Sequence, residues 1–436
     1  MLLALVLAAA GAASSSGPLH FIEDDYPKAL AQAKKQHQPL FVDFGASWCH
    51  TCLSMQRTVM RDPGLRPVAH AVVWLAIDTE AERNKPLVDK FPLDVWPTFL
   101  ILNPEDETVI GRWLGAASVT DFRAFVEQGA DAYKARRRPP TPAAAEQRKG
   151  DEARLRSDLP ASAAAYARAL QLSQLEDPQR PERLALYENS LRKLRTPEAA
   201  RTCVKLALDE MDQTGDSAIV TDFIGFASAC AAGLAKDDPE VRRLRVASIQ
   251  RLSVLMARSD APLSADDRSD AYATLIEMLD EAGRHSDAVT FARKRAAVLE
   301  EAAAKASDAT QASTYDPHRT ETWLYLHEPE KAEKLLAARE KEMPSDYNPP
   351  SRLARVLLEE HRLPEAEAAV DRALAKMTRG NRRIGILGLK AKILAAQDKP
   401  LQAVLREELE VMRSLPQSQR NPETEAKLEA QLAPAR

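Results

Sequence analysis

Residues 39–60 read PLFVDFGASWCHTCLSMQRTVM, and this stretch decides the fold of the N-terminal part of the chain. Its apolar start, Leu40 to Phe44, has the length and the β-favouring side chains of a buried strand. The residues from Leu53 onward contain no helix breaker, so a helix is predicted there. Cys49 and Cys52 therefore fall at a helix N-terminus, where the helix dipole and unpaired N–H groups stabilise a thiolate. We expect Cys49 to be the nucleophile, with Cys52 one turn further on.

Length and composition limit the classes of protein that the chain can be. A chain of 436 residues is too long for one ordinary core, so two or more domains are expected. The 60 basic and 64 acidic residues nearly balance, which gives no support for a nucleic-acid partner. The abundance of Ala, Leu, Arg and Glu, with only 15 Gly, favours helix over most of the chain.

The first twenty residues, MLLALVLAAAGAASSSGPLH, have the pattern of an export signal. An apolar run is followed by small and polar residues, so residues 1–13 are predicted to be a cleaved signal peptide. No Lys or Arg precedes the apolar run, and an uncleaved anchor, a misplaced start codon or a buried helix are the alternatives. No later stretch is apolar for long enough to span a membrane. We therefore expect a soluble exported protein of the bacterial periplasm or cell envelope, with no stable transmembrane segment in the mature chain.

Short strands and helices alternate over residues 20–133. A helix is predicted over 25–37, strands over 40–44 and 71–77, a helix over 80–90, two hairpin strands over 98–102 and 108–113, and a last helix from 118 to about 132. The predicted order is βαβαββα with one further helix at the N-terminus. This order indicates an α/β sandwich.

Four further residues connect this pattern with a known family. Trp48 directly precedes Cys49, Asp43 ends the first long strand, Pro97 opens a later strand, and Gly115 follows the hairpin. A CxxC motif beside a βαβ pattern is typical of thioredoxins. The segment resembles a thioredoxin-fold domain, and most closely the exported thioredoxin-like disulfide-reductase modules of bacteria.

The resemblance implies a set of site residues and a chemistry. Cys49 would attack a substrate disulfide, Cys52 would resolve it, and buried Asp43 would relay a proton. Pro97 would be a cis-proline that exposes the backbone of Trp96 to an extended peptide. The implied substrate groove consists of Trp48, His50, Thr51, Trp96, Pro97 and Gly115. Trp48 is equally compatible with a packing role, and Asp43 with an ordinary polar position at a strand end. No cofactor is expected beyond the redox-active Cys49–Cys52 disulfide.

Two departures from the family pattern leave the direction of electron flow open. The residues between the cysteines are His50 and Thr51 rather than Gly-Pro, and a histidine there stabilises the thiolate and favours an oxidase or isomerase. Asp43 favours a reductase. The family's lysine beside the buried acid aligns with Trp74, so its loss is expected to raise the pKa of Asp43 further.

Zinc is the alternative use of the two cysteines. A structural zinc site needs four ligands, and the only further candidates are His50 and the distant Cys203 and Cys230. No metal site is therefore predicted.

Composition changes after residue 133. Residues 134–145 are basic and rich in proline, which predicts a linker, and residues 146–434 read as paired amphipathic helices. Ala332 and Ala366 are 34 residues apart in similar Ala-rich helix starts, which is the tetratricopeptide period. The chain thus resembles tetratricopeptide-type (TPR-like) repeats from about residue 270 to 415. An irregular helical solenoid is the alternative for residues 143–260.

Cys203 and Cys230 are predicted to lie on consecutive antiparallel helices, at similar distances from the turn between them. In an oxidising compartment they could form a structural disulfide. Two buried thiols are the alternative.

The sequence thus predicts an exported thiol-disulfide oxidoreductase whose helical repeats bind a protein disulfide substrate or a redox partner. The main alternative is an interaction scaffold in which the thioredoxin-like domain senses redox state or docks a partner. A peroxidase is disfavoured, because two neighbouring cysteines suit dithiol exchange better.

Overall fold

A computed structural model describes residues 17–136, 138–378, 380–415 and 420–433. The predicted signal peptide lies outside these residues. The first part of the chain, which we call the α/β unit, contains five strands and four helices in the order β1 Phe21–Glu23, α1 Tyr26–Gln36, β2 Leu40–Gly45, α2 His50–Arg57, β3 Val73–Asp78, α3 Lys85–Lys90, β4 Thr98–Leu102, β5 Val109–Leu114 and α4 Val119–Lys134. Short 3-10 helices η1 (Val59–Arg61), η2 (Pro63–Val68) and η3 (Glu82–Asn84) lie between them.

The strands form one mixed sheet in the order β1-β3-β2-β4-β5. β3 pairs in parallel with β1 and β2, whereas β4 is antiparallel to β2 and β5. β2 is the central strand, and all six of its residues are buried. The carboxyl end of β2 therefore leads directly from the middle of the sheet to Cys49.

Alternating side chains of the sheet enter two separate cores, as the period of two along a strand requires. Phe41, Trp74 and Phe99 pack on one face with Phe122 of α4 and Met55 of α2. The opposite face is covered by α1 and α3. The structure thus confirms the predicted α/β sandwich.

Three details differ from the sequence prediction. β1 was not predicted, because three residues at a sheet edge are too few to show alternation. The helix predicted over 80–90 is divided into η3 and the one-and-a-half-turn α3. Residues 134 and 142–145 of the predicted linker are helical, since α4 ends at Lys134 and α5 begins at Pro142, with Thr141 accepting the N–H of Ala144.

The rest of the described chain, which we call the helical region, contains only helices. They are α5 Pro142–Leu155, α6 Leu159–Gln171, α7 Arg180–Leu194, α8 Pro197–Glu210, α9 Ala218–Ala231, α10 Pro239–Ala257, α11 Ala265–Glu281, α12 His285–Lys305, α13 Ala309–Ala312, α14 Asp316–Tyr325, α15 Pro329–Glu342, α16 Asn348–Glu359, α17 Leu363–Lys376, α18 Asn381–Ala396, α19 Gln402–Ser414 and α20 Pro422–Leu432, with the 3-10 helices η4 Met211–Thr214 and η5 Ser313–Tyr315. None of the described helices is long and apolar enough to cross a membrane.

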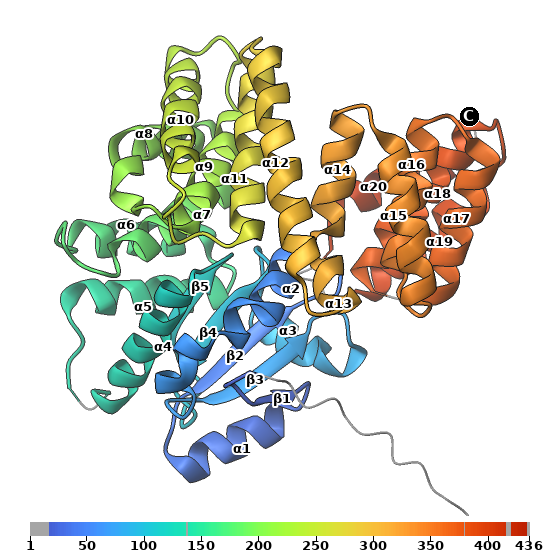
Figure 1. The fold of residues 1–436 in the computed structure, drawn as a ribbon. Coiled ribbons are helices and arrows are strands. Elements are labelled where there is room, and N and C mark those ends of the chain that lie inside the picture. The colour runs from blue at the N-terminus through green and yellow to red at the C-terminus, as the bar shows by residue number, and fades with distance from the viewer. Residues whose placement is uncertain (1–16, 137, 379, 416–419, 434–436) are drawn as a thin grey trace, which may run out of the picture.

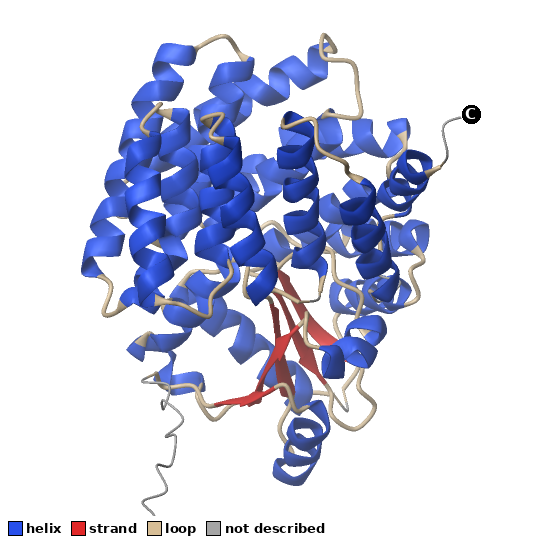
Figure 2. Cartoon of the chain, turned by 90° about the vertical axis from the view of Figure 1, so that its right-hand side faces the viewer, coloured by secondary structure: helices blue, strands red, loops and turns tan. Residues whose placement is uncertain are grey.

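Consecutive helices pack against each other along the whole region, which confirms a TPR-like helical-repeat architecture after the α/β unit. Ala332 of α15 and Ala366 of α17 are both fully buried, so the small residues that mark the 34-residue period lie where helices approach closely. Figures 1 and 2 show that the helices gather over one end of the sheet. That is the end at which α2 and the two cysteines lie, and α2 contacts both α11 and η5.

Candidate active site

Cys49 and Cys52 lie at the N-terminus of α2. Their sulfur atoms are 2.25 Å apart, at disulfide distance. Cys49 is the N-cap residue, and its Sγ accepts the backbone N–H of Cys52 at 3.0 Å. Because β2 ends four residues earlier, the sheet fixes the position of this cap. A thiolate released at Cys49 would be stabilised by the same N–H group and by the dipole of α2.

Asp43 is buried beneath the cysteine pair, with 1% of its surface exposed. Gln56 of α2 donates to its Oδ2 at 2.9 Å, while no residue that the structure describes is a hydrogen-bond partner of Oδ1. Burial raises the pKa of Asp43 to about 7, against a lowering by Gln56. A Cβ on Gly45 would lie 3.8 Å from Asp43 Oδ1 and 3.6 Å from Cys52 Cβ. The unpartnered oxygen and Cys52 therefore border the same small space.

The register of β2 and β3 pairs Ala76 with Asp43, and Trp74 with Phe41 in the aromatic core. Trp74 is thus diagonally across from Asp43 on the same face of the sheet. Burial is the main cause of the raised pKa of Asp43.

The aromatic residues of the implied substrate groove lie around the disulfide. The Trp96–Pro97 peptide bond is cis, as the resemblance implies. The Trp48 and Trp96 rings pack at 5.7 Å between centroids, and both contact the cluster that contains Ala46 and the cysteines. Trp48 also packs against the apolar core around Tyr347. It thus has both of the roles that the sequence left open, packing and lining the site.

Gly115 lies against α9 instead of bordering an open groove. Its N–H donates to Pro97 O at 2.9 Å, and its φ of +77° is a conformation that favours glycine. A Cβ on Gly115 would be only 2.3 Å from Asp222 Oδ2. That oxygen is enclosed without a hydrogen-bond partner in the described part of the chain, and burial raises the pKa of Asp222 well above its ordinary value.

His50, between the two cysteines, faces the helical region. Its Nδ1 lies 3.3 Å from Asp266 Oδ2 on α11 and 2.9 Å from His318 Nε2 on α14. Asp270, one turn after Asp266, completes a cluster of four side chains. Burial lowers the pKa of His50, but Asp266 and Asp270 outweigh it and raise the value to about 9. Thr51 Oγ1 lies 3.2 Å from the same His50 nitrogen, so its side chain belongs to this environment.

Further contacts attach the helical region beside the disulfide. Ser47 Oγ and Tyr347 Oη are 3.3 Å apart, Arg57 donates to Ser313 and Thr314 at 3.2 Å, and the N–H of Arg382 donates to Glu80 at 3.0 Å. Cys49 is 5% exposed and Cys52 1% exposed, and both lie in a small apolar cluster with Ala46, Trp48 and Trp96. The helical region thus contacts residues on both sides of Cys49 in the sequence, Ser47 and His50.

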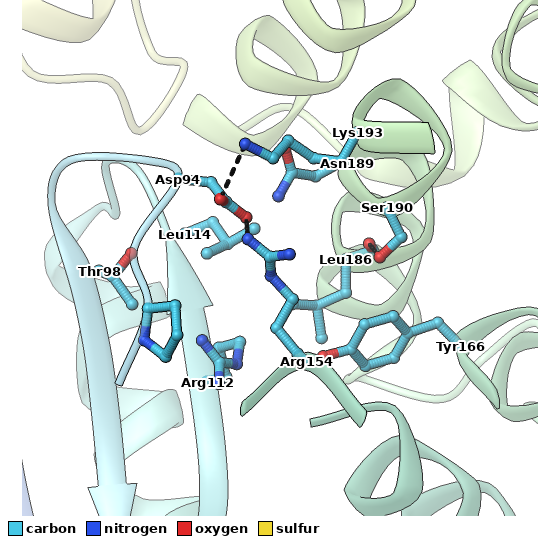
Figure 3. Close-up of a pocket in the computed structure, with 11 residues that line it drawn as sticks. Asp94, Thr98, Arg112, Leu114, Arg154, Tyr166, Leu186, Asn189, Ser190 and Lys193 are labelled. Carbon is cyan, nitrogen blue, oxygen red and sulfur yellow. Dashed lines mark hydrogen bonds and ion pairs between the residues drawn. The ribbon is translucent and has the colours of Figure 1, made fainter. Parts of the chain in front are cut away.

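The other side of the α/β unit is also joined to the helical region, as Figure 3 shows. Asp94, in the loop before Pro97, forms ion pairs with Arg154 of α5 and Lys193 of α7. Nearby, Arg112 Nε of β5 lies 2.6 Å from Asp151 Oδ1 of α5, and both side chains are about 5% exposed or less. The helical region therefore holds both the cysteine loop and the strand that leads to Gly115.

Cys203 of α8 and Cys230 of α9 belong to a small apolar cluster with Leu191 and Ala199, separate from the cluster of Cys49 and Cys52. The sulfur atoms of Cys203 and Cys230 are 1.96 Å apart, at bonding distance.

Sequence reasoning missed the residues that the helical region adds to the site, namely Asp222, Asp266, Asp270 and His318. One signal was present, since Asp266 and Asp270 are four residues apart and so share a helix face. Nothing in the sequence indicated that this face would meet His50. Asp266 and His318, which meet His50 at the interface, are 216 and 268 positions away from it in the sequence.

Comparison with known proteins concerns mainly the α/β unit. Residues 22–104 match a family model described as thioredoxin-like, so this segment is thioredoxin-like with a cysteine pair at disulfide distance. No curated protein matches the chain.

Two solved structures are among those similar to the chain. One is a tetratricopeptide repeat protein from Parabacteroides merdae, with 10% identity and a TM-score of 0.42, covering 66% of this chain and 98% of that one. Another is the APC/C hetero-tetramer Cut9–Hcn1, with 14% identity and a TM-score of 0.30, covering 66% of this chain and 48% of that one.

Proposed function

We propose that the protein is an exported thiol-disulfide oxidoreductase that acts on protein disulfides through Cys49 and Cys52. The observation that carries the proposal is the pair of sulfurs at disulfide distance on the N-terminus of α2, above the enclosed carboxyl of Asp43. Exchange at such a pair uses the two sulfurs alone, so it needs no cofactor.

In the reducing direction, the Cys49 thiolate attacks one sulfur of the substrate disulfide and releases the other as a thiolate. Cys52 then attacks Cys49 Sγ, which frees the substrate's second thiolate and forms the Cys49–Cys52 disulfide. Two electrons pass from the dithiol to the substrate. Asp43 accepts the Cys52 proton, since its free oxygen borders the same space and its pKa of about 7 lies close to neutrality. In the oxidising direction the same steps run in reverse.

The helical region would bind the protein substrate or redox partner and control access to Cys49. Because Cys49 is 5% exposed, a protein disulfide reaches it only after the helices around Ser47 and His50 move. An oxidising compartment is favoured by Cys203 and Cys230, whose sulfurs lie at bonding distance. Export to the periplasm agrees with the signal-like pattern of residues 1–13.

Reduction of insulin disulfides by dithiothreitol tests the proposal. The purified protein should accelerate precipitation of the reduced insulin chains, and Cys49→Ser should abolish the acceleration. If the parent and Cys49→Ser were equally inactive in insulin reduction, the proposal that the protein is an oxidoreductase would be contradicted. A redox titration of the pair against glutathione then assigns the direction of electron flow.

A second candidate, a redox-sensing scaffold, is favoured by the burial of both cysteines under the helices. In that case reduction of the pair changes how the helical region binds its partner, and there is no turnover. Hydrogen exchange distinguishes the two: a sensor would show reduction-dependent exchange in α11 and α14 without insulin reductase activity.

A further inference from the structure

The four-residue cluster at the interface has the composition of a metal site. His50 comes from α2 of the α/β unit, Asp266 and Asp270 from α11, and His318 from α14. One ligand atom from each residue lies within 4.8 Å of the other three. Two imidazoles and two carboxylates are a donor set that zinc and neighbouring divalent transition metals accept.

The distances within the cluster fit a tetrahedral ion. Zinc binds nitrogen and oxygen at about 2.0–2.2 Å, so ligand atoms on a tetrahedron are about 3.3–3.6 Å apart. Asp266 lies 3.3 Å from each histidine, through Oδ2 to His50 Nδ1 and through Oδ1 to His318 Nε2, and His318 Nε2 to Asp270 Oδ1 measures 3.4 Å. The two histidine nitrogens are closer, at 2.9 Å.

Protons hold this arrangement poorly. Arg295 Nη2 lies 2.5 Å from His318 Nδ1, and arginine can only donate, so the proton of a neutral His318 lies on Nε2. That nitrogen lies 2.9 Å from His50 Nδ1 and 3.3 Å from Asp266 Oδ1. If both histidines donate to Asp266, their two N–H groups lie side by side with the nitrogens only 2.9 Å apart.

Asp266 bears the consequence of this conflict. Its side chain is 0% exposed, and its Oδ1 lies 3.3 Å from His318 Nε2, but no well-aligned hydrogen bond reaches that oxygen from the described residues. Buried charges normally pair or coordinate metals. A cation between the four side chains would receive the lone pairs of both imidazoles and neutralise both carboxylates.

We propose that His50, Asp266, Asp270 and His318 bind one divalent transition-metal ion, with zinc the best match, at the interface over the cysteine pair. Calcium and magnesium are disfavoured, since they prefer sites made entirely of oxygen. The side chains of His50 and Asp270 are 30% and 32% exposed, which gives the ion a path from solvent. The bound ion would join α2 to α11 and α14 and hold the helices over Cys49.

One contact changes when the ion binds. His318 then carries its proton on Nδ1, so Arg295 has to release that atom. Glu321 Oε2 lies 3.5 Å from Arg295 Nη2 and 3.9 Å from His318 Nδ1, so it can accept from either group. Glu321 would thus be the positioning carboxylate that a metal-bound histidine normally has behind it.

The test uses the full chain with both active-site cysteines replaced, Cys49→Ser with Cys52→Ser, so that no thiolate there can bind metal. This protein lacks the proposed redox chemistry, and the result therefore does not depend on the oxidoreductase proposal. Metal-free protein is titrated with Co²⁺ and then with Zn²⁺. One equivalent of Co²⁺ should produce the visible absorption of a tetrahedral site, and Zn²⁺ should displace it.

Added to the same background, Asp266→Asn and His318→Gln should each remove stoichiometric binding, and Glu321→Gln should weaken it about 10- to 100-fold. The matched control is His285→Gln, since His285 forms a similar pair with Asp280 at 2.9 Å on the surface. It should leave binding unchanged.

His50→Gln, on the α/β unit, provides a second variant if the α11 and α14 variants fail to fold, as judged by circular dichroism. Absence of one-to-one Co²⁺ binding, or its retention in folded His50→Gln or Asp266→Asn, would overturn the proposal.

Discussion

Asp222 of α9 occupies the position that a side chain on Gly115 would need, since a Cβ there would lie 2.3 Å from Asp222 Oδ2. This contact joins the loop after β5 to the helical region. We expect Gly115→Ala to weaken the interface, because the methyl group must displace Asp222 and the φ of +77° is unfavourable for alanine. Unfolding in urea measures the loss of stability.

Gly283, just after α11, is the control for this prediction. Its φ is +74° and a Cβ there would meet no described atom within 4 Å, so Gly283→Ala carries only the backbone cost of roughly 1–2 kcal/mol. Gly115→Ala should cost about 1–3 kcal/mol more than this control, the usual cost of overpacking. Asp222→Gly, which opens the space, should recover most of the difference. Equal losses for the two alanine variants would show that Asp222 does not hold the interface.

The cover over the active site predicts slow access to Cys49. In Cys52→Ala the remaining thiol should react slowly with a bulky maleimide, because Cys49 is 5% exposed. Adding Gly115→Ala, which loosens the interface, should speed the reaction. The labelling rate by mass spectrometry is the measurement. Rapid labelling in the parent variant would mean that the helices do not cover the thiol in solution.

The raised pKa of Asp43 predicts that the oxidised protein becomes less stable as the pH rises. Burial raises the pKa of Asp43 from 3.8 to about 7, so the fold favours the protonated acid. The contribution of protonated Asp43 to the free energy of unfolding is fully present below about pH 4 and is lost as the pH rises through 7. Each tenfold difference in proton affinity corresponds to about 1.4 kcal/mol. Asp43→Asn should therefore be more stable than the parent at pH 8, and the difference should shrink toward pH 5.

The control for Asp43→Asn is Asp131→Asn, which changes an exposed acid on α4. It should leave the pH dependence of urea unfolding unchanged. In kinetics, Asp43→Asn should slow release of the mixed disulfide by roughly 100-fold at neutral pH, if Asp43 is the base for Cys52. If release of the mixed disulfide had the same pH profile in Asp43→Asn as in the parent, Asp43 would not be the base for Cys52.

Breaking the Arg112–Asp151 ion pair, which joins β5 to α5, is expected to destabilise the protein strongly. Both side chains are buried, and Tyr166 also donates to Asp151 at 2.8 Å. Asp151→Asn would leave the guanidinium of Arg112 buried without its counter-charge, which typically costs about 3–5 kcal/mol. Asp131→Asn breaks an exposed pair with Lys134 and should cost less than about 1 kcal/mol. Similar melting temperatures for the two variants would contradict this.

Much of the α/β unit could be predicted from sequence because its signals are local. A few consecutive residues are enough to predict the strand before Cys49, the cap at α2 and the hairpin strands. β1 was missed, since three residues at a sheet edge carry no periodic signal. The 34-residue spacing of Ala332 and Ala366 likewise predicted close helix packing.

The arrangement around His50 could not be predicted, for a physical reason. Asp266 is 216 positions from His50, and Ser47 is 300 positions from Tyr347. The sum of many small rotations between successive helices decides which helix face meets the cysteine loop, and no short motif encodes that sum. The cover over Cys49 therefore became visible only in three dimensions.

The same long separations set an order of events during synthesis. When the ribosome has made the α/β unit, neither Asp266 nor Tyr347 yet exists, so the cysteine pair is uncovered in the nascent chain. Domains generally fold as they emerge, N-terminal first. Closure over Cys49 is thus among the last steps of maturation, and the dithiol has its widest access to oxidants and to other thiols before the chain is complete.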